Sequence, residues 1–170
     1  HVDATALVLV DIAPRVEAEG VQKIFAFMTQ RPEGFDTLEE VADAIAAYQP
    51  YRTRPKNLDG LAKNLRLSDN GKYCWHWDPR FLIPGHGPHP GQQGDRLRSA
   101  ARKLRVPTLL VRGKLSDLLS EEGARDFLEL VPHARFADVS DAGHMVAGDR
   151  NDAFNNAVVD ENFFPDGRFK

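Results

Sequence analysis

The sequence has little of what disulfide-bonded, membrane-spanning or strongly basic proteins need. One cysteine among 170 residues, Cys74, cannot form an internal disulfide, so we expect a reducing, cytoplasmic setting. The longest strongly apolar run, residues 6–10, is far shorter than the roughly 20 residues that cross a bilayer. No basic segment precedes an apolar stretch at the start, so no secretory signal is expected in these residues. The formal charge is -3 and no long basic run is present, which makes nucleic acid and acidic membrane surfaces poor partners.

The composition is that of a globular protein with a real core. Hydrophobic residues make up 42% and charged residues 28% of the chain, which excludes a disordered segment. A chain of 170 residues fits one ordinary domain, or a domain with a small insertion. It can bury roughly 70% of the surface that it exposes when unfolded.

Three apolar segments predict strands of a parallel sheet. Residues 7–10 are continuously apolar, a pattern typical of a strand covered on both faces. Residues 107–113 and 134–139 predict two more strands, and helices are predicted from Ser120 onward and over 152–159. Alternating strands and helices indicate right-handed crossovers and an α/β fold.

The middle of the chain is predicted to be mainly helical. Apolar spacing predicts helices over 21–28 and 56–65, and a further helix is expected over 95–104. Thr37 followed by Glu40 is a capping-box pattern, which predicts a helix that ends near Tyr48. A turn at 69–71 precedes a short strand over 73–77, and a loop rich in proline and glycine follows over 78–94.

The spacing of the motifs resembles the α/β-hydrolase fold family. Residues 106–113 followed by Ser116 and Asp117 are similar to its acid loop, and Ala-Gly-His-Met at 142–145 is similar to its histidine loop. The opening residues 7–14 are similar to the strand that precedes the lid of that family.

The resemblance implies an architecture for the whole chain. The expected fold is the C-terminal part of an α/β-hydrolase parallel sheet with an inserted, mainly helical lid. Residues 1–15 would hold a core strand, 16–94 the lid, and 95–170 the C-terminal part of the core.

The same resemblance implies that a catalytic group is missing. The family carries its nucleophile on a Gly-x-Ser-x-Gly elbow upstream of the strand that opens this chain, and no serine here has the flanking glycines. We therefore expect the isolated chain to be inactive. A serine or aspartate nucleophile would come from a missing N-terminal half, and that half or a second copy would complete the sheet.

His144 and Asp117 are the residues to which the resemblance gives catalytic roles. A hydroxyl nucleophile is weak until a histidine takes its proton, and a carboxylate must hold that histidine in one tautomer. Asp11 is an alternative acid, because some family members place the acid after the earlier strand; we expect it instead to accept hydrogen bonds from loop amides. Asp141 is expected to stabilise the turn before His144.

Several apolar side chains of the expected lid are candidates for a substrate pocket. They are Trp75, Trp77, Phe25 and Met28, together with Phe27, and the alternative is that they form ordinary lid core. Cys74 is expected to pack as a small hydrophobe, since no second motif indicates a thiol nucleophile.

A metal site is a further alternative. Pro-Gly-His-Gly at 84–87 resembles a loop of metallo-β-lactamase-fold hydrolases, but the histidine cluster of that family is absent. His76, His86 and His89 lack a carboxylate or cysteine partner at fixed spacing, so no metal and no cofactor are expected.

The function predicted by resemblance is hydrolysis of a small ester, amide, epoxide or related bond. Two alternatives stay open, a non-catalytic binding fragment and a metallohydrolase-like enzyme. The substrate is a small molecule, and its identity depends on the shape of the pocket rather than on a motif.

Overall fold

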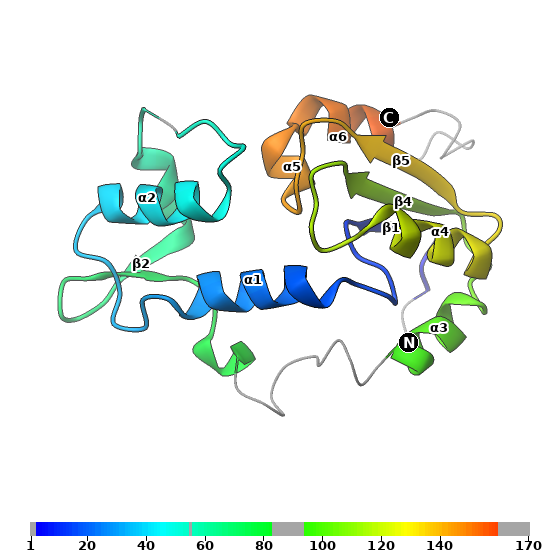
Figure 1. Ribbon diagram of the computed structural model, residues 1–170, viewed down its shortest axis with the longest axis horizontal. Coiled ribbons are helices and arrows are strands. Elements are labelled where there is room, and N and C mark those ends of the chain that lie inside the picture. The colour runs from blue at the N-terminus through cyan, green and yellow to red at the C-terminus, as the bar shows by residue number, and fades with distance from the viewer. Residues whose placement is uncertain (1–2, 55, 83–93, 160–170) are drawn as a thin grey trace. The chain divides into compact units, whose positions relative to one another are not determined.

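A computed structural model of the chain describes residues 3–54, 56–82 and 94–159, which divide into two compact units (Figure 1). The first unit holds the described residues of His1–Val21 and His89–Lys170, and the second holds those of Gln22–Pro88. In the part of the chain that is described, no helix is both long and apolar enough to span a membrane.

The first unit contains a parallel sheet of three strands. They are β1 (Leu7–Val10), β4 (Thr108–Gly113) and β5 (Arg135–Val139), in the order β1-β4-β5. Leu9 pairs with Leu110, and Arg112 pairs with Asp138. Every residue of the central strand β4 is buried, as its continuous apolar run predicts. The three predicted strands and their parallel arrangement are confirmed.

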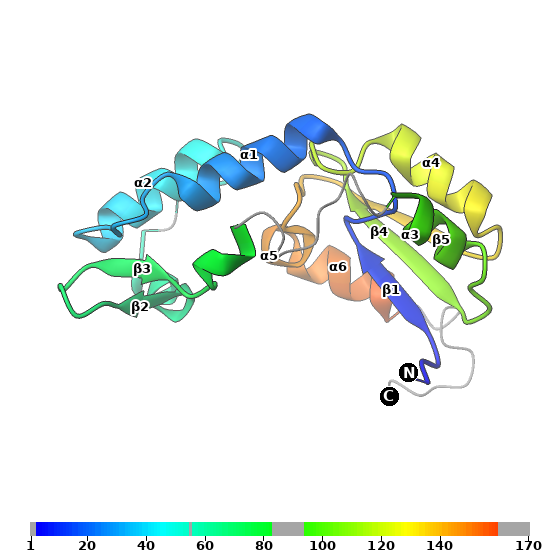
Figure 2. The same cartoon turned by 90° about the horizontal axis from the view of Figure 1, so that it is seen from below.

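Helices cover both faces of this sheet (Figure 2). They are α3 (Gly94–Ala101) and α4 (Glu121–Leu130) on one face, and α5 (Val146–Asp149) and α6 (Asn151–Val158) on the other. Side chains alternate across a strand, so Leu110 packs toward α4 whereas Leu109 and Val111 pack toward α5 and α6. The alternation in β4 therefore makes two cores, one on each side of the sheet.

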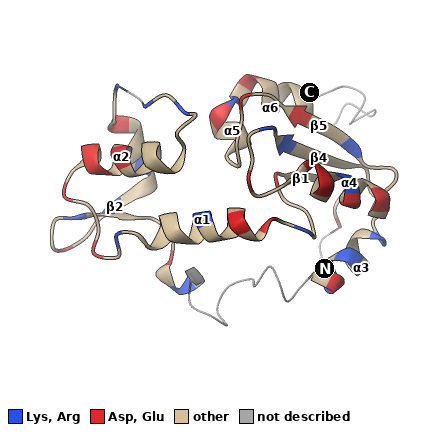
Figure 3. Ribbon diagram, viewed as in Figure 1, with Lys and Arg blue, Asp and Glu red and all other residues tan. Residues whose placement is uncertain are grey.

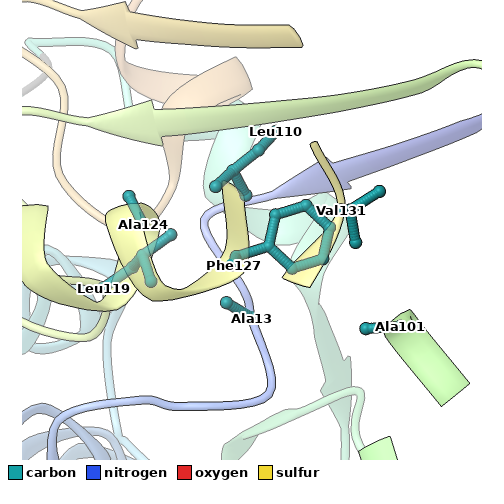
Figure 4. Close-up of a cluster of buried hydrophobic side chains, with 7 residues drawn as sticks. All are labelled: Ala13, Ala101, Leu110, Leu119, Ala124, Phe127 and Val131. Atoms are coloured by element: carbon teal, nitrogen blue, oxygen red, sulfur yellow. The ribbon is translucent and has the colours of Figure 1, made fainter. Parts of the chain in front are cut away.

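Phe127 lies in the middle of the core beneath α4 (Figure 4). Only 1% of its surface is exposed. The side chains of this buried cluster are those of Ala13, Ala101, Leu110, Leu119, Ala124, Phe127 and Val131. Ala13 belongs to this cluster, so the chain that leaves β1 is fixed against α4 at the same end of the sheet as the loops described below.

Ion pairs also connect the loop after β1 to α4. Arg15 Nη1 donates to Glu122 Oε1 at 2.9 Å and to Asp126 Oδ2 at 3.0 Å. These two hydrogen bonds raise the pKa of Arg15 above its ordinary value. Because Arg15 is four residues from Asp11, the contacts help to fix the path of the chain beyond Asp11.

The second unit combines helices with a short hairpin. Its elements are most of α1 (Ala18–Thr29), α2 (Leu38–Tyr48), the 3-10 helices η1 (Asp59–Asn64) and η2 (Pro79–Leu82), and the antiparallel strands β2 (Leu65–Leu67) and β3 (Tyr73–Trp75). Phe35, Val41 and Leu65 form its buried centre. Thr37 Oγ1 accepts from the Glu40 amide, so the predicted cap of α2 is confirmed. The first turn of α2 contains acidic residues (red ribbon in Figure 3), whose negative charges interact favourably with the helix dipole.

The prediction of an α-helix over 56–65 is wrong. The segment forms the shorter η1, and Leu65 is already extended and pairs with Trp75. The spacing of Leu58, Leu61 and Leu65 fits a helix, but the hairpin buries Leu65 just as well. The short helix α5 has no counterpart among the predicted elements, and the loop predicted over 78–94 begins as η2 and then continues outside the described residues.

Candidate active site

Loops from all three strands of the sheet meet at its carboxyl end. Asp11 directly follows β1, Gly113 is the last residue of β4, and His144 lies in the loop after β5. In an open α/β sheet this edge is where ligands bind, because the loops that leave parallel strands converge there.

Asp11 and His144 are in direct contact. Nδ1 of His144 lies 2.9 Å from Oδ2 of Asp11, although 133 positions separate the two residues in sequence. Asp11 is completely buried, and 30% of the His144 side chain is exposed. The imidazole is therefore held from inside the fold while its outer part remains accessible.

Two further donors hold the Asp11 carboxylate. The Gly113 amide donates to Oδ1 at 3.1 Å, and Ser116 Oγ donates to Oδ2 at 2.5 Å. A carboxylate that accepts from these groups and from His144 is suited to its ionised form, which only accepts. Nδ1 of His144 then carries the proton, and Nε2 is left with a lone pair that can take a proton from another group.

The backbone of Asp11 directs its side chain toward the end of β4. Its φ is +52°, in the left-handed region, which aspartate adopts more readily than most residues. Its amide still donates to Val111 O at 2.7 Å, so the β1–β4 pairing continues up to this residue. The chain therefore changes direction at Asp11, whose amide still makes a hydrogen bond to β4.

Gly113 provides the space for the loop that carries His144. A Cβ atom at this position would lie 2.2 Å from Gly143 O and 2.5 Å from Ala142 O. The loop that carries His144 therefore rests directly on the backbone of β4. Leu115 N donates to Ala142 O at 2.8 Å and secures the same contact.

The carboxylate within hydrogen-bond distance of Nδ1 of His144 is not that of Asp117, the acid that we expected. The carboxylate on Nδ1 of His144 is that of Asp11, while the Asp117 side chain lies exposed in the loop between β4 and α4. The backbone of that loop turns the neighbouring Ser116 inward, and the Ser116 hydroxyl reaches Asp11. Asp11 accepts the amide of Gly113, the last residue of β4, rather than loop amides, and it also accepts the histidine, which was expected only as the alternative. Asp141 accepts from Arg150 at 2.8 Å in the turn before His144.

The candidate pocket residues of the second unit are brought together only in part. Trp75 and Trp77 are stacked, with ring centroids 4.8 Å apart. Phe27 lies 5.4 Å from Trp75 and 6.3 Å from Trp77, and it stacks on Tyr48 at 4.4 Å. Phe25 is 36% exposed, and Met28 is half-buried. The aromatic cluster is thus centred on Phe27, and sequence reasoning did not include Tyr48.

The described residues contain no group of three or more histidine, cysteine or acidic side chains placed to hold a metal ion. His76 lies exposed after β3, whereas His86 and His89 fall outside the described residues. Cys74 lies within β3 and is half-buried, with its Sγ 3.8 Å from Ser68 Oγ.

Comparison with known proteins shows which fold this is. No family model matches the chain. A 3-hydroxybutyrate-oligomer hydrolase from Cupriavidus necator is 26% identical over 150 residues, which cover 81% of this chain and 50% of that protein.

Solved structures agree over almost the whole chain. E-2-(acetamidomethylene)succinate hydrolase matches with a TM-score of 0.74 at 20% identity, covering 95% of this chain and 58% of its own. An α/β hydrolase from Novosphingobium aromaticivorans matches with a TM-score of 0.68 at 24% identity over 91% and 55%. An esterase from Mycobacterium tuberculosis matches with a TM-score of 0.65 at 26% identity over 91% and 50%.

The chain spans about half the length of these relatives. This chain itself contains the parallel sheet, the helices on both faces and the loops that carry Asp11 and His144. The chain has the fold of the α/β hydrolases and fits the C-terminal part of that fold.

Proposed function

We propose that this chain supplies the base and the acid of a hydrolase whose nucleophile lies outside these residues. His144 would be the general base, and Asp11 would orient it. The observation that supports this most directly is the 2.9 Å contact between a buried carboxylate and a histidine at the carboxyl end of the sheet.

The geometry suits proton transfer from a hydroxyl or a water molecule. With Nδ1 bound to Asp11, the other ring nitrogen of His144 can accept a proton, and the buried carboxylate stabilises the imidazolium that results. Ser116 is not a candidate nucleophile, because its hydroxyl donates to Asp11 rather than to the histidine. A nucleophile must give its proton to the base.

We propose an ester as the bond that is cleaved. Amides and epoxides suit the same pair of residues, but one relative at 26% identity is an esterase, and another is a hydrolase of oligomers of 3-hydroxybutyrate, a hydroxy acid whose units can join through ester bonds. We also propose that residues 16–94 act as the lid. The separate core of the second unit and its aromatic cluster support this proposal.

The experiment that tests this function uses the product of the complete reading frame that contains these residues. Turnover of a p-nitrophenyl ester and of a short hydroxyacid ester oligomer is measured for the wild type and for His144→Gln, Asp11→Asn and Asp117→Asn. We expect His144→Gln and Asp11→Asn each to lower kcat by at least about a thousandfold, as in other triads. Asp117→Asn should stay within about threefold of the wild type, since its carboxylate does not hold the histidine.

A second arm assays the isolated 170-residue chain. We expect no ester turnover above background, since none of its serines has the flanking glycines of a nucleophile elbow. Robust hydrolysis by the isolated chain would overturn the assignment of the nucleophile. Full activity of His144→Gln in the complete protein would overturn the proposed function and favour a binding fragment.

A further inference from the structure

The hydrogen bonds around the Ser116 hydroxyl leave one acceptor for its proton. The amides of Leu118 and Leu119 donate to Ser116 Oγ at 3.1 and 3.3 Å. Since both are donors, they direct the hydroxyl proton away from themselves. Ser116 Oγ donates to Asp11 Oδ2 at 2.5 Å.

The oxygen that receives this proton is the one that binds the histidine. Asp11 Oδ2 accepts from Ser116 and from His144 Nδ1, while Oδ1 accepts from the Gly113 amide. With both oxygens held, the carboxylate cannot rotate about its Cβ–Cγ bond without breaking hydrogen bonds in a buried site. A buried carboxylate that loses a donor is costly, because water cannot replace that donor.

We propose that Ser116 is a positioning residue for the Asp11–His144 pair, an inference that rests on the proposed function. It acts through Asp11. Its hydroxyl fixes the carboxylate so that Oδ2 meets Nδ1, which keeps His144 in the tautomer with a free lone pair on Nε2.

The loop itself does not depend on Ser116 alone. The buried Arg112 donates from Nε to Leu119 O at 2.8 Å, and Glu17 N donates to Leu118 O at 2.9 Å. Removal of the hydroxyl should therefore leave the loop folded, so that the effect on Asp11 can be measured separately.

Ser120 offers a matched control in the same loop. Its Oγ also accepts a backbone amide, that of Gly123 at 3.0 Å, and also donates to a carboxylate, Glu17 Oε1 at 2.5 Å. Ser120 caps α4 and its carboxylate partner is a different one. A purely structural hydroxyl of this kind should affect stability without affecting His144.

The test is NMR of the product of the complete reading frame that contains these residues, with ¹⁵N-labelled histidine, comparing wild type, Ser116→Ala, Ser116→Thr and Ser120→Ala. In the wild type we expect His144 to show the Nδ1–H tautomer and a slowly exchanging Hδ1 proton. Ser116→Ala should speed exchange of this proton by at least about tenfold, the factor expected from loss of one hydrogen bond to a charged group. Ser116→Thr keeps the hydroxyl and should restore slow exchange, and Ser120→Ala should leave it slow.

The outcomes separate this inference from the proposed function. If the wild type itself lacks the Nδ1–H tautomer, the Asp11–His144 arrangement is wrong, and both fail. If the wild type shows it and Ser116→Ala exchanges at the wild-type rate, the role of Ser116 is wrong while the proposed function stands. Equal acceleration in Ser116→Ala and Ser120→Ala would reduce Ser116 to a loop-stabilising residue and would also overturn the inference.

Discussion

At the scale of single residues, the site depends on Gly113, a residue that has no side chain. Asp11 and His144 lie in loops after β1 and β5, two strands that are not neighbours because β4 lies between them. Their side chains meet at the end of β4, where Gly113 has no Cβ and so leaves room for the loop that carries His144. The glycine amide also donates to Asp11, so the same residue provides both the space and a hydrogen bond.

Gly113→Ala should therefore disturb the site as well as the fold. The added Cβ would meet backbone oxygens, which cannot rotate away, so the His144 loop must shift. We expect a loss of about 1–3 kcal/mol in the free energy of unfolding, typical of overpacking. Urea denaturation measures it. Gly94→Ala is the matched control in the same unit, because nothing lies within 4 Å of its added Cβ, and a loss as large there would contradict the argument.

The sequence predicts the base of the site better than its acid. His144 is placed by a glycine-containing turn after a clear strand, and the structure has it there. Asp11 and Asp117 both follow continuously apolar strands, so spacing alone does not distinguish them. Which of the two carboxylates binds the histidine depends on two features of the folded structure. These are the left-handed backbone of Asp11 and the inward orientation of the Ser116 side chain.

At the scale of elements, strands in the core could be predicted and short elements of the second unit could not. Continuous apolar runs specify buried parallel strands, and a threonine cap specifies the start of α2. The segment that forms η1 and β2 has leucines that suit either a helix or a strand. Its conformation is decided by pairing with β3, a contact that is not local in sequence.

Arg112 connects β4 to β5 and to the loop that precedes α4. It is 6% exposed, its Nη1 donates to Asp138 Oδ1 on β5 at 3.1 Å, and its Nε donates to Leu119 O before α4. A buried guanidinium with these partners fixes the loop of Ser116 against β4 and β5.

Arg112→Met should destabilise the first unit by about 3 kcal/mol, since it leaves the Asp138 carboxylate and the Leu119 carbonyl without their donor. Asp138→Asn keeps an oxygen acceptor and the Leu119 contact, so its loss should be smaller, about 1 kcal/mol. Chemical denaturation of both variants gives the comparison. Equal losses of unfolding free energy in the two variants would mean that the hydrogen bond from Arg112 to Leu119 O adds no stability.

At the scale of the whole molecule, the sheet ends at a strand that has a partner on one side only. Among the described residues, β1 pairs with β4 and with no other strand. An apolar groove of about 230 Å³ lies beside it, between β1 and the helices α3 and α4. Its lining residues include Leu7, Leu9, Leu97, Leu104 and Phe127. An open apolar edge of this kind favours pairing with another chain.

We expect the 170-residue chain to associate through this edge, either with a second copy or with a segment that corresponds to the other half of its relatives. Size-exclusion chromatography with light scattering at micromolar concentration should show a species larger than a monomer. Leu97→Lys places a charge in the groove at a residue that is already 41% exposed, so it should shift the chain toward monomer without unfolding it. Leu67→Lys makes the same change at a 66% exposed position on β2 of the second unit, which does not line the groove, and should leave the association unchanged. A wild-type chain that is monomeric and melts cooperatively would show that β1 needs no further partner, and the groove would then have to be explained without one.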